Sequence, residues 1–311
     1  MKKNSNAGIL YLVITIILFS SFEVVSKSTK GIVLPTQLTF IRFLIGGIFL
    51  LPFAIRDLKK RKLKLTKKNI LWLFILGFLN VGISMNLAQY GIQMTKASLA
   101  AVLFSSNPLY VAVFSAFLLK ERLSLKKIVG LLVGVVGVSI AMISGGGSGR
   151  EFYLGSGLLI LGAIVFSVYT VLGKQTTVEL GSLTMTSVTF IFGCITMIPI
   201  FMAQGVKPWN FPFNEVWPQI LYLSVLVSGI AYFLYFKALS MLDTSLGSMT
   251  FFVKPILASI FAAVVLGETL RVNLFVGSIL VIVGITIVRK ATVSAALNKS
   301  AKVNISLVSD K

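Results

Sequence analysis

The stretch "NPLYVAVFSAFLLKERLSLKKIVG" at residues 107–130 returns in altered form as "KPILASIFAAVVLGETLRVNLFVG" at residues 254–277. In both copies a proline stands near the start, a glutamate near the middle and a glycine at the end, and no gap interrupts the match. One spacing, 147 positions, relates all three pairs, which are Pro108 and Pro255, Glu121 and Glu268, and Gly130 and Gly277. A constant spacing over a gap-free match indicates that the chain contains a duplication.

The same register extends over most of the chain. Further pairs at this spacing are Gly8 and Gly155, Phe19 and Phe166, Lys27 and Lys174, Gly46 and Gly193, Pro52 and Pro199, Gly82 and Gly229, and Gly137 and Gly284. The glycine-rich stretch "SGGGSGR" at 144–150 joins the two copies. The protein is therefore expected to consist of two similar halves.

The composition places both halves in a membrane. Of the 311 residues, 56% are hydrophobic and 12% are charged, which is too apolar for one soluble core. A helix needs about 18 or more apolar residues to cross the hydrocarbon of a bilayer. Ten such runs lie at roughly 8–27, 35–55, 70–93, 97–119, 125–143, 153–173, 181–203, 216–240, 244–266 and 271–289.

Each copy contains five spans, so the second copy enters the membrane from the opposite side. The expected fold is an all-α integral membrane protein with ten transmembrane helices arranged as two inverted five-helix repeats. The repeats take up residues 1–143 and 153–289, with a linker at 144–152 and a disordered cytoplasmic tail at 290–311. Inverted repeats are typical of secondary transporters, because two such halves can rock between states that expose one site to either side.

The formal net charge of +20 is distributed unevenly between the two faces of the membrane. With both termini inside, the outer face holds six of the 29 basic residues, Arg42 and Lys254 lie within spans, and the remaining 21 are inside. This asymmetry predicts a cell-membrane protein with cytoplasmic termini. No aromatic-interleaved basic module accompanies the charge, so nucleic acid is not an expected partner.

The chain lacks the residues on which several classes of function depend. The chain has no histidine and one cysteine, Cys194, so neither a catalytic site, a metal site nor a cofactor is expected. It also has no Walker A pattern for direct use of ATP. A receptor or assembly subunit that transports nothing remains the rival to a transporter.

The expected partners are a small-molecule substrate, the lipid bilayer and, if transport is coupled, protons. The oligomeric state stays open.

The spans resemble a known family. Two five-helix repeats that end in "LLKERLSLKKIVGLLVGVVGVSI" and "VLGETLRVNLFVGSILVIVGITIV" are similar to those of EamA-type proteins in the drug/metabolite transporter superfamily. The resemblance covers about residues 8–289. It implies a transporter of an amino acid, a drug or another small metabolite, working as an exporter by alternating access. Uptake or exchange on the same fold is the alternative.

Charges at hydrocarbon depth are candidates for function, because one at the centre of a span costs about 2.5–3.5 kcal/mol. Lys254 lies beside the mid-span Pro255, and its repeat counterpart Asn107 is also polar. We expect both to face one cavity near the midplane and to bind substrate, with Lys254 attracting a carboxylate or phosphate. The alternative is a structural role.

Glu23 is the acidic residue that we place inside a span, and Arg42 is a cation in the next span. One interpretation is that Glu23 exchanges a proton as water reaches it from alternate sides, which would couple transport to a proton gradient. The other is that Glu23 and Arg42 form a fixed ion pair that joins two helices.

Other polar and aromatic residues could line the same cavity, although aromatic residues in membrane helices more often serve packing. In the third and eighth spans these candidates are Asn86, Gln89, Tyr90, Tyr232 and Tyr235.

The paired residues of the opening stretch have structural interpretations. Pro108 and Pro255 are expected to bend their spans or to serve substrate binding. Glu121 and Glu268 stand at span ends, where a carboxylate can cap the following helix. The repeated glycines are expected to permit close helix packing, and they are Gly130, Gly134, Gly137, Gly277 and Gly284.

Overall fold

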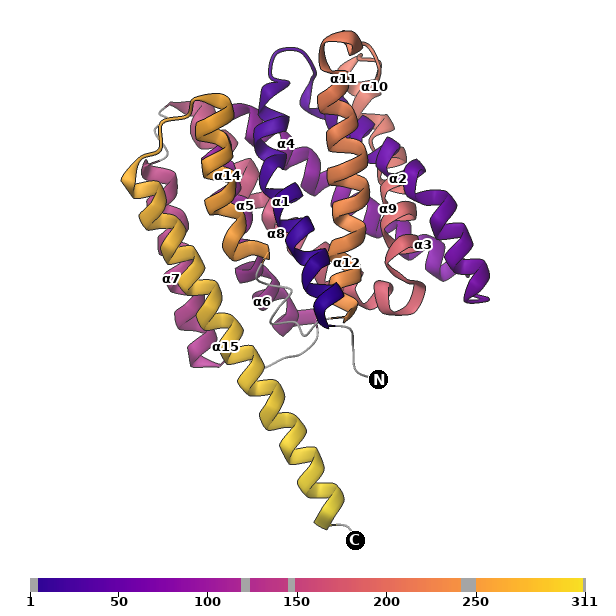
Figure 1. The fold of residues 1–311 in the computed structure, drawn as a ribbon, viewed down its shortest axis with the longest axis vertical. Helices are drawn as coiled ribbons and strands as arrows, with labels where there is room; N and C mark the ends of the chain where they lie inside the picture. The colour runs from indigo at the N-terminus through magenta and orange to yellow at the C-terminus, as the bar shows by residue number, and fades with distance from the viewer. Residues whose placement is uncertain (1–4, 119–123, 145–148, 242–249, 310–311) are drawn as a thin grey trace.

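The computed structural model is a bundle of helices, with no strand among the residues it describes, which are 5–118, 124–144, 149–241 and 250–309 (Figure 1). Nine of the described helical runs are long and apolar enough to cross a membrane, and Val253–Leu266 is a shorter apolar helix. Each of these ten segments overlaps one of the ten predicted spans. The ten-helix fold is therefore confirmed.

The helices that the structure describes divide evenly between the halves. The first half contains α1 (Ser5–Ser28), α2 (Pro35–Lys60), α3 (Lys67–Gly77), η1 (Phe78–Met85), α4 (Asn86–Met94), α5 (Ala97–Ser105), α6 (Asn107–Leu118) and α7 (Leu125–Ser144). The second half contains α8 (Arg150–Leu180), α9 (Ser182–Thr196), α10 (Ile198–Gln204), α11 (Phe213–Leu221), η2 (Tyr222–Ala231), α12 (Tyr232–Met241), α14 (Thr250–Leu266) and α15 (Val272–Ser309).

The duplication extends to an uncommon backbone conformation. In the third span, η1 is a π-helix between α3 and α4, and in the eighth span η2 is a π-helix between α11 and α12. Moving η1 by the repeat spacing places it at 225–232, which overlaps η2. Because π-helical segments are rare and are often found at functional sites, their recurrence at equivalent positions shows that the repeat register also holds for the backbone conformation.

The two halves interleave rather than form separate lobes. The main packing partners cross between halves: α1 packs on α14 and α12, α2 on α9 and η2, α4 on α8, and α7 on α15. Since α1 corresponds to α8 and α12 to α4 in the repeat, the contact of α1 with α12 repeats that of α8 with α4. The chain enters α1 and leaves α15 at the same end of the bundle (Figure 1), as an even number of spans requires.

The two repeated prolines have different effects on their spans. The fourth span breaks at Ser106, where α5 ends and α6 begins, and Pro108 lies in the first turn of α6. A proline inside an unbroken helix would remove one backbone donor and clash with the carbonyl four residues earlier, whereas a proline in the first turn is tolerated, which accounts for the break. In the ninth span, Pro255 lies inside α14, whose described helix continues across it.

Glu268 caps a helix, but not the one that follows it. Its Oε1 accepts a hydrogen bond from the Ala97 backbone N–H (2.7 Å), and its Oε2 accepts from the Ser98 N–H (3.1 Å) and hydroxyl (2.6 Å). The capped helix is therefore α5 of the other repeat, which corrects the expectation that it would cap α15. Sequence order does not indicate which helix is capped, because the halves interleave. The matching expectation for Glu121 falls outside the described residues.

The end of the chain also differs from its prediction. The helix α15 continues through the expected disordered tail as far as Ser309 and extends well beyond the bundle (Figure 1). From Arg289 to Ser309 the sequence has no proline and no glycine. Nothing there ends a helix once it has started, since these two residues are the strongest local helix breakers.

The packing role predicted for the repeated glycines is clear between α7 and α15. A Cβ atom added to Gly284 would lie 2.6 Å from the Gly130 carbonyl oxygen and 2.6 Å from the Gly134 nitrogen. A Cβ on Gly277 would lie 2.7 Å from the Gly137 carbonyl oxygen. These neighbours are backbone atoms, so no side-chain rotation relieves the contact, and the close approach of the two helices depends on glycine.

Gly284→Leu is therefore expected to force α15 away from α7 and to destabilise the protein by about 1–3 kcal/mol or more. Thermal unfolding of the purified protein in detergent measures the effect. Gly157→Leu on α8 is the matched control, because a Cβ at Gly157 meets no atom within 4 Å. Equal melting temperatures for the two variants would contradict this account of the α7–α15 interface.

Candidate functional site

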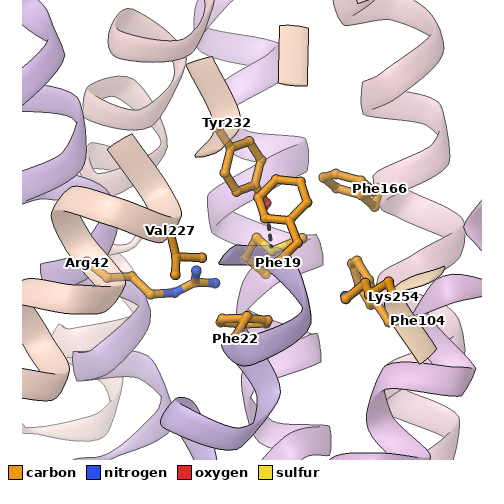
Figure 2. A pocket seen from close by; sticks show the side chains of 9 residues that line it. Phe19, Phe22, Arg42, Phe104, Phe166, Val227, Tyr232 and Lys254 are labelled. Atoms are coloured by element: carbon orange, nitrogen blue, oxygen red, sulfur yellow. Dashed lines mark hydrogen bonds between the residues drawn. The ribbon is translucent and has the colours of Figure 1, made fainter. Parts of the chain in front are cut away.

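A cavity lies where the two halves meet (Figure 2). It has a volume of about 30 Å³, which is room for a water molecule or two. The first half lines it with Phe19, Phe22, Arg42, Met85 and Phe104, and the second half with Phe166, Val227, Tyr232 and Lys254. Most of this wall is apolar and much of it is aromatic, so the two cations stand out.

Lys254 forms an ion pair inside the bundle. Its Nζ donates a hydrogen bond of 2.6 Å to Oε1 of Glu23, and the two residues are 4% and 0% exposed. The ammonium also lies 5.2 Å from the centre of the Phe104 ring. The second carboxylate oxygen of Glu23, Oε2, has no hydrogen-bond partner among the described residues. The pair joins α1 of one half to α14 of the other.

Arg42 is held on α2 without an acidic hydrogen-bond partner in the described part of the chain. Its guanidinium carbon lies 4.4 Å from the centre of the Phe22 ring and 4.2 Å from that of Phe43. Its Nη1 donates a 3.3 Å hydrogen bond to the hydroxyl of Ser228. Cation–π contacts of this kind stabilise a desolvated cation by about 2 kcal/mol. The remaining nitrogens, Nε and Nη2, have no partner among the described residues, although the side chain is buried.

Aromatic rings complete the wall. The Tyr232 ring meets Phe19 edge to face at 5.0 Å, and its hydroxyl donates to the sulfur of Met85 at 3.4 Å. In the view of Figure 2, Arg42 and Lys254 lie on opposite sides, with Phe19 and Phe22 between them. The site therefore has an aromatic middle flanked by two cations, one of which is paired.

Comparison with known proteins assigns the chain to a family. The profile of a family described as the EamA-like transporter family matches residues 6–143 and 153–290. The chain belongs to the EamA-like transporter family. It is a multi-pass membrane transporter, and its relationships point away from enzymes.

Relatives of this EamA-family transporter are similar over most of their length. A protein of Clostridium kluyveri described as an uncharacterized transporter is 33% identical, over 91% of this chain and 92% of that protein. The uncharacterized transporter YetK of Bacillus subtilis is 27% identical, over 80% of this chain and 77% of its own. One solved crystal structure matches 94% of this chain and 98% of its own with a TM-score of 0.65 and 20% identity, which shows a common fold.

The structure of this EamA-family protein brings some of the predicted site residues together. Arg42, Tyr232 and Lys254 line the cavity, and Glu23 contacts it through Lys254. The expected pairing of Glu23 with Arg42 is wrong, because Glu23 forms its ion pair with Lys254. Sequence order favours a pair between consecutive spans, whereas α1 packs on α14 of the other half.

Other predicted residues do not line this cavity. Asn107 donates from Nδ2 to the carbonyl oxygen of Ala163 at 3.1 Å, and its Oδ1 is buried without a described partner. Tyr90 shares hydrogen bonds with Thr36 (2.8 Å) and Gln204 (2.9 Å). The remaining predicted residues outside the lining are Asn86, Gln89 and Tyr235, all of which are buried.

Sequence reasoning missed most of the aromatic wall. Phe22, Phe104 and Phe166 are ordinary apolar residues of membrane helices, and nothing in their spacing distinguishes them from packing residues. One signal was available: Phe19 and Phe166 are repeat counterparts, and both reach the cavity. A counterpart pair of rings is consistent with a site on the pseudo-symmetry axis of an inverted repeat.

Proposed function

We propose that this transporter exports a small organic metabolite by alternating access, with the aromatic cavity as its substrate site. One observation carries the proposal: the cavity wall is built from both inverted halves, five residues from the first and four from the second. When one half rocks against the other, the residues on both sides of such a cavity move relative to one another. The cavity can then open toward either face of the membrane. A site inside one half would not respond in this way.

We further propose that the Glu23–Lys254 pair couples transport to protons. The pair links α1 to α14, so movement of the halves changes the distance between its charges. A buried carboxylate that loses its cation is costly to keep charged, and it binds a proton once water reaches it. Release of that proton on the other side would drive the exchange of protons for substrate.

Flux measurements test the transport function. Purified protein is first screened by thermal shift against metabolites, because a ligand stabilises the state that it binds. The best ligand is then used in labelled form with proteoliposomes. Counterflow of label is expected, and an imposed pH gradient is expected to drive its accumulation. Binding without any flux would contradict transport and favour a receptor, whereas accumulation driven only in the inward direction would favour an uptake permease.

The orientation is tested by labelling single cysteines in cells with a membrane-impermeant maleimide. The native Cys194 is 2% exposed and contributes little background. Suitable positions are the exposed Arg150, at the joint between the halves, and the exposed Lys59, in the last turn of α2. The positive-inside rule predicts that Arg150→Cys reacts in intact cells and that Lys59→Cys reacts only after permeabilisation. Reaction of both positions under the same condition would refute the ten-span topology.

A further inference from the structure

The charges around the cavity do not balance. Glu23 and Lys254 neutralise each other through their 2.6 Å hydrogen bond, and Arg42 remains as the one unpaired charge among the described residues at the cavity. Two cations and one anion leave a net charge of +1. An uncompensated charge in an apolar site is unfavourable, so the site is suited to a substrate that carries one negative charge.

The unpartnered atoms of Arg42 indicate the shape of that negative group. Nη1 is taken by Ser228, and the rings of Phe22 and Phe43 fix the plane of the guanidinium. The free nitrogens, Nε and Nη2, share one edge of the guanidinium and present two parallel N–H groups. That edge matches the two oxygens of a carboxylate in a bidentate pair.

The rest of the wall indicates the body of the substrate. Five of the nine lining residues are aromatic, and Met85 and Val227 add apolar surface. Lys254 balances the charge of Glu23, which is not itself a lining residue, so the wall offers no uncompensated negative charge to an ammonium group on the substrate. A second positive or negative charge on the substrate would therefore lack a partner.

We propose that the cavity selects organic monocarboxylates with an aromatic or bulky apolar body and no ammonium group, and that the Nε–Nη2 edge of Arg42 binds the carboxylate. This inference rests on the proposed function, because it takes the cavity as the substrate site. It also moves the anion-binding role that we expected of Lys254 to Arg42. The helices must part to admit the body of such a molecule, since the cavity holds only a water molecule or two.

Equilibrium binding to the purified wild-type protein tests the charge requirement. The probe is 3-phenylpropionate, compared with its neutral amide, 3-phenylpropionamide, and with its zwitterionic relative, phenylalanine. Binding of the acid is expected to be about tenfold to a hundredfold tighter than that of either analogue, the range given by charge-assisted hydrogen bonds. Equal affinity for the acid and the amide, or no detectable binding of the acid, would overturn the inference.

Variants of Arg42 test the contact itself. Arg42→Lys keeps the positive charge but loses the two parallel N–H groups of the guanidinium, and Arg42→Gln loses both the charge and these groups. Each variant is therefore expected to weaken binding of 3-phenylpropionate about tenfold to a hundredfold. Arg56→Gln, at an exposed position on the same helix α2, is the matched control and should bind as the wild type does. Unchanged affinity in either Arg42 variant would overturn the assignment. If neither variant folds, the ligand comparison on the wild type still decides.

The outcomes separate this inference from the proposed function. Flux of another solute without binding of the monocarboxylate would refute the substrate class and leave transport standing. Tight, Arg42-dependent binding of the monocarboxylate without any flux in proteoliposomes would refute transport and leave the binding site standing.

Discussion

Lys254→Met is expected to destabilise the protein by about 3–5 kcal/mol, the usual cost of breaking a buried ion pair by removing one partner. The cost arises because the Glu23 carboxylate is 0% exposed and would lose the ammonium 2.6 Å away. Its other oxygen has no described partner that could compensate. Thermal unfolding in detergent measures the change. This expectation follows the structural role of Lys254, which was the alternative to substrate binding in the sequence analysis.

Two further variants identify the cause. Lys30→Met removes an exposed lysine close to the end of α1 and should leave the melting temperature nearly unchanged. The double variant Glu23→Gln with Lys254→Met leaves no buried charge from the pair and should recover most of the lost stability. A double variant no more stable than Lys254→Met alone would mean that lost packing, and not an orphaned carboxylate, causes the instability.

Glu23→Gln is expected to abolish the accumulation of substrate in response to a pH gradient. The amide keeps one acceptor for the Lys254 ammonium, but it cannot bind or release a proton at these pH values. The buried ammonium loses its counter-charge, so some loss of stability is expected as well. The assay is uptake of the labelled substrate into proteoliposomes with an imposed pH gradient. Downhill flux without a gradient is expected to persist, because it requires only the movement of the halves.

The opposite result would also be informative. If Glu23→Gln accumulates substrate as well as the wild type does, Glu23 is not the proton carrier, and the ion pair only joins the two halves. Loss of downhill flux as well would instead indicate that the charge of Glu23 is needed for movement itself. Melting curves of the same preparations show whether either loss reflects misfolding.

The plan of the fold could be predicted from the sequence. The repeat spacing and the apolar runs located ten spans, and the recurrence of glycines on one side of the fifth and tenth spans identified them as packing residues. These features are visible in a sequence because they follow from local hydrophobicity and from comparison of one half with the other.

The partners of individual residues could not be predicted in the same way. Glu23 and Lys254 are 231 positions apart, and Glu268 caps a helix that starts 171 positions before it. The register tells which residues are equivalent, but not which helices touch across the halves. The choice of Arg42 as partner of Glu23 failed for this reason, as did the choice of the helix capped by Glu268. The π-helices η1 and η2 had no recognisable local signature.

The small volume of the cavity has a consequence for how tightly any cargo can be held. A molecule larger than a water or two must be accommodated by a widened state, and its measured dissociation constant equals the intrinsic constant divided by the fraction of molecules in that state. The free energy needed to separate the helices thus offsets part of the favourable binding free energy of the aromatic wall and of Arg42. Weak apparent binding is then compatible with many good contacts, and it favours a carrier, because cargo that is held loosely leaves quickly on the far side.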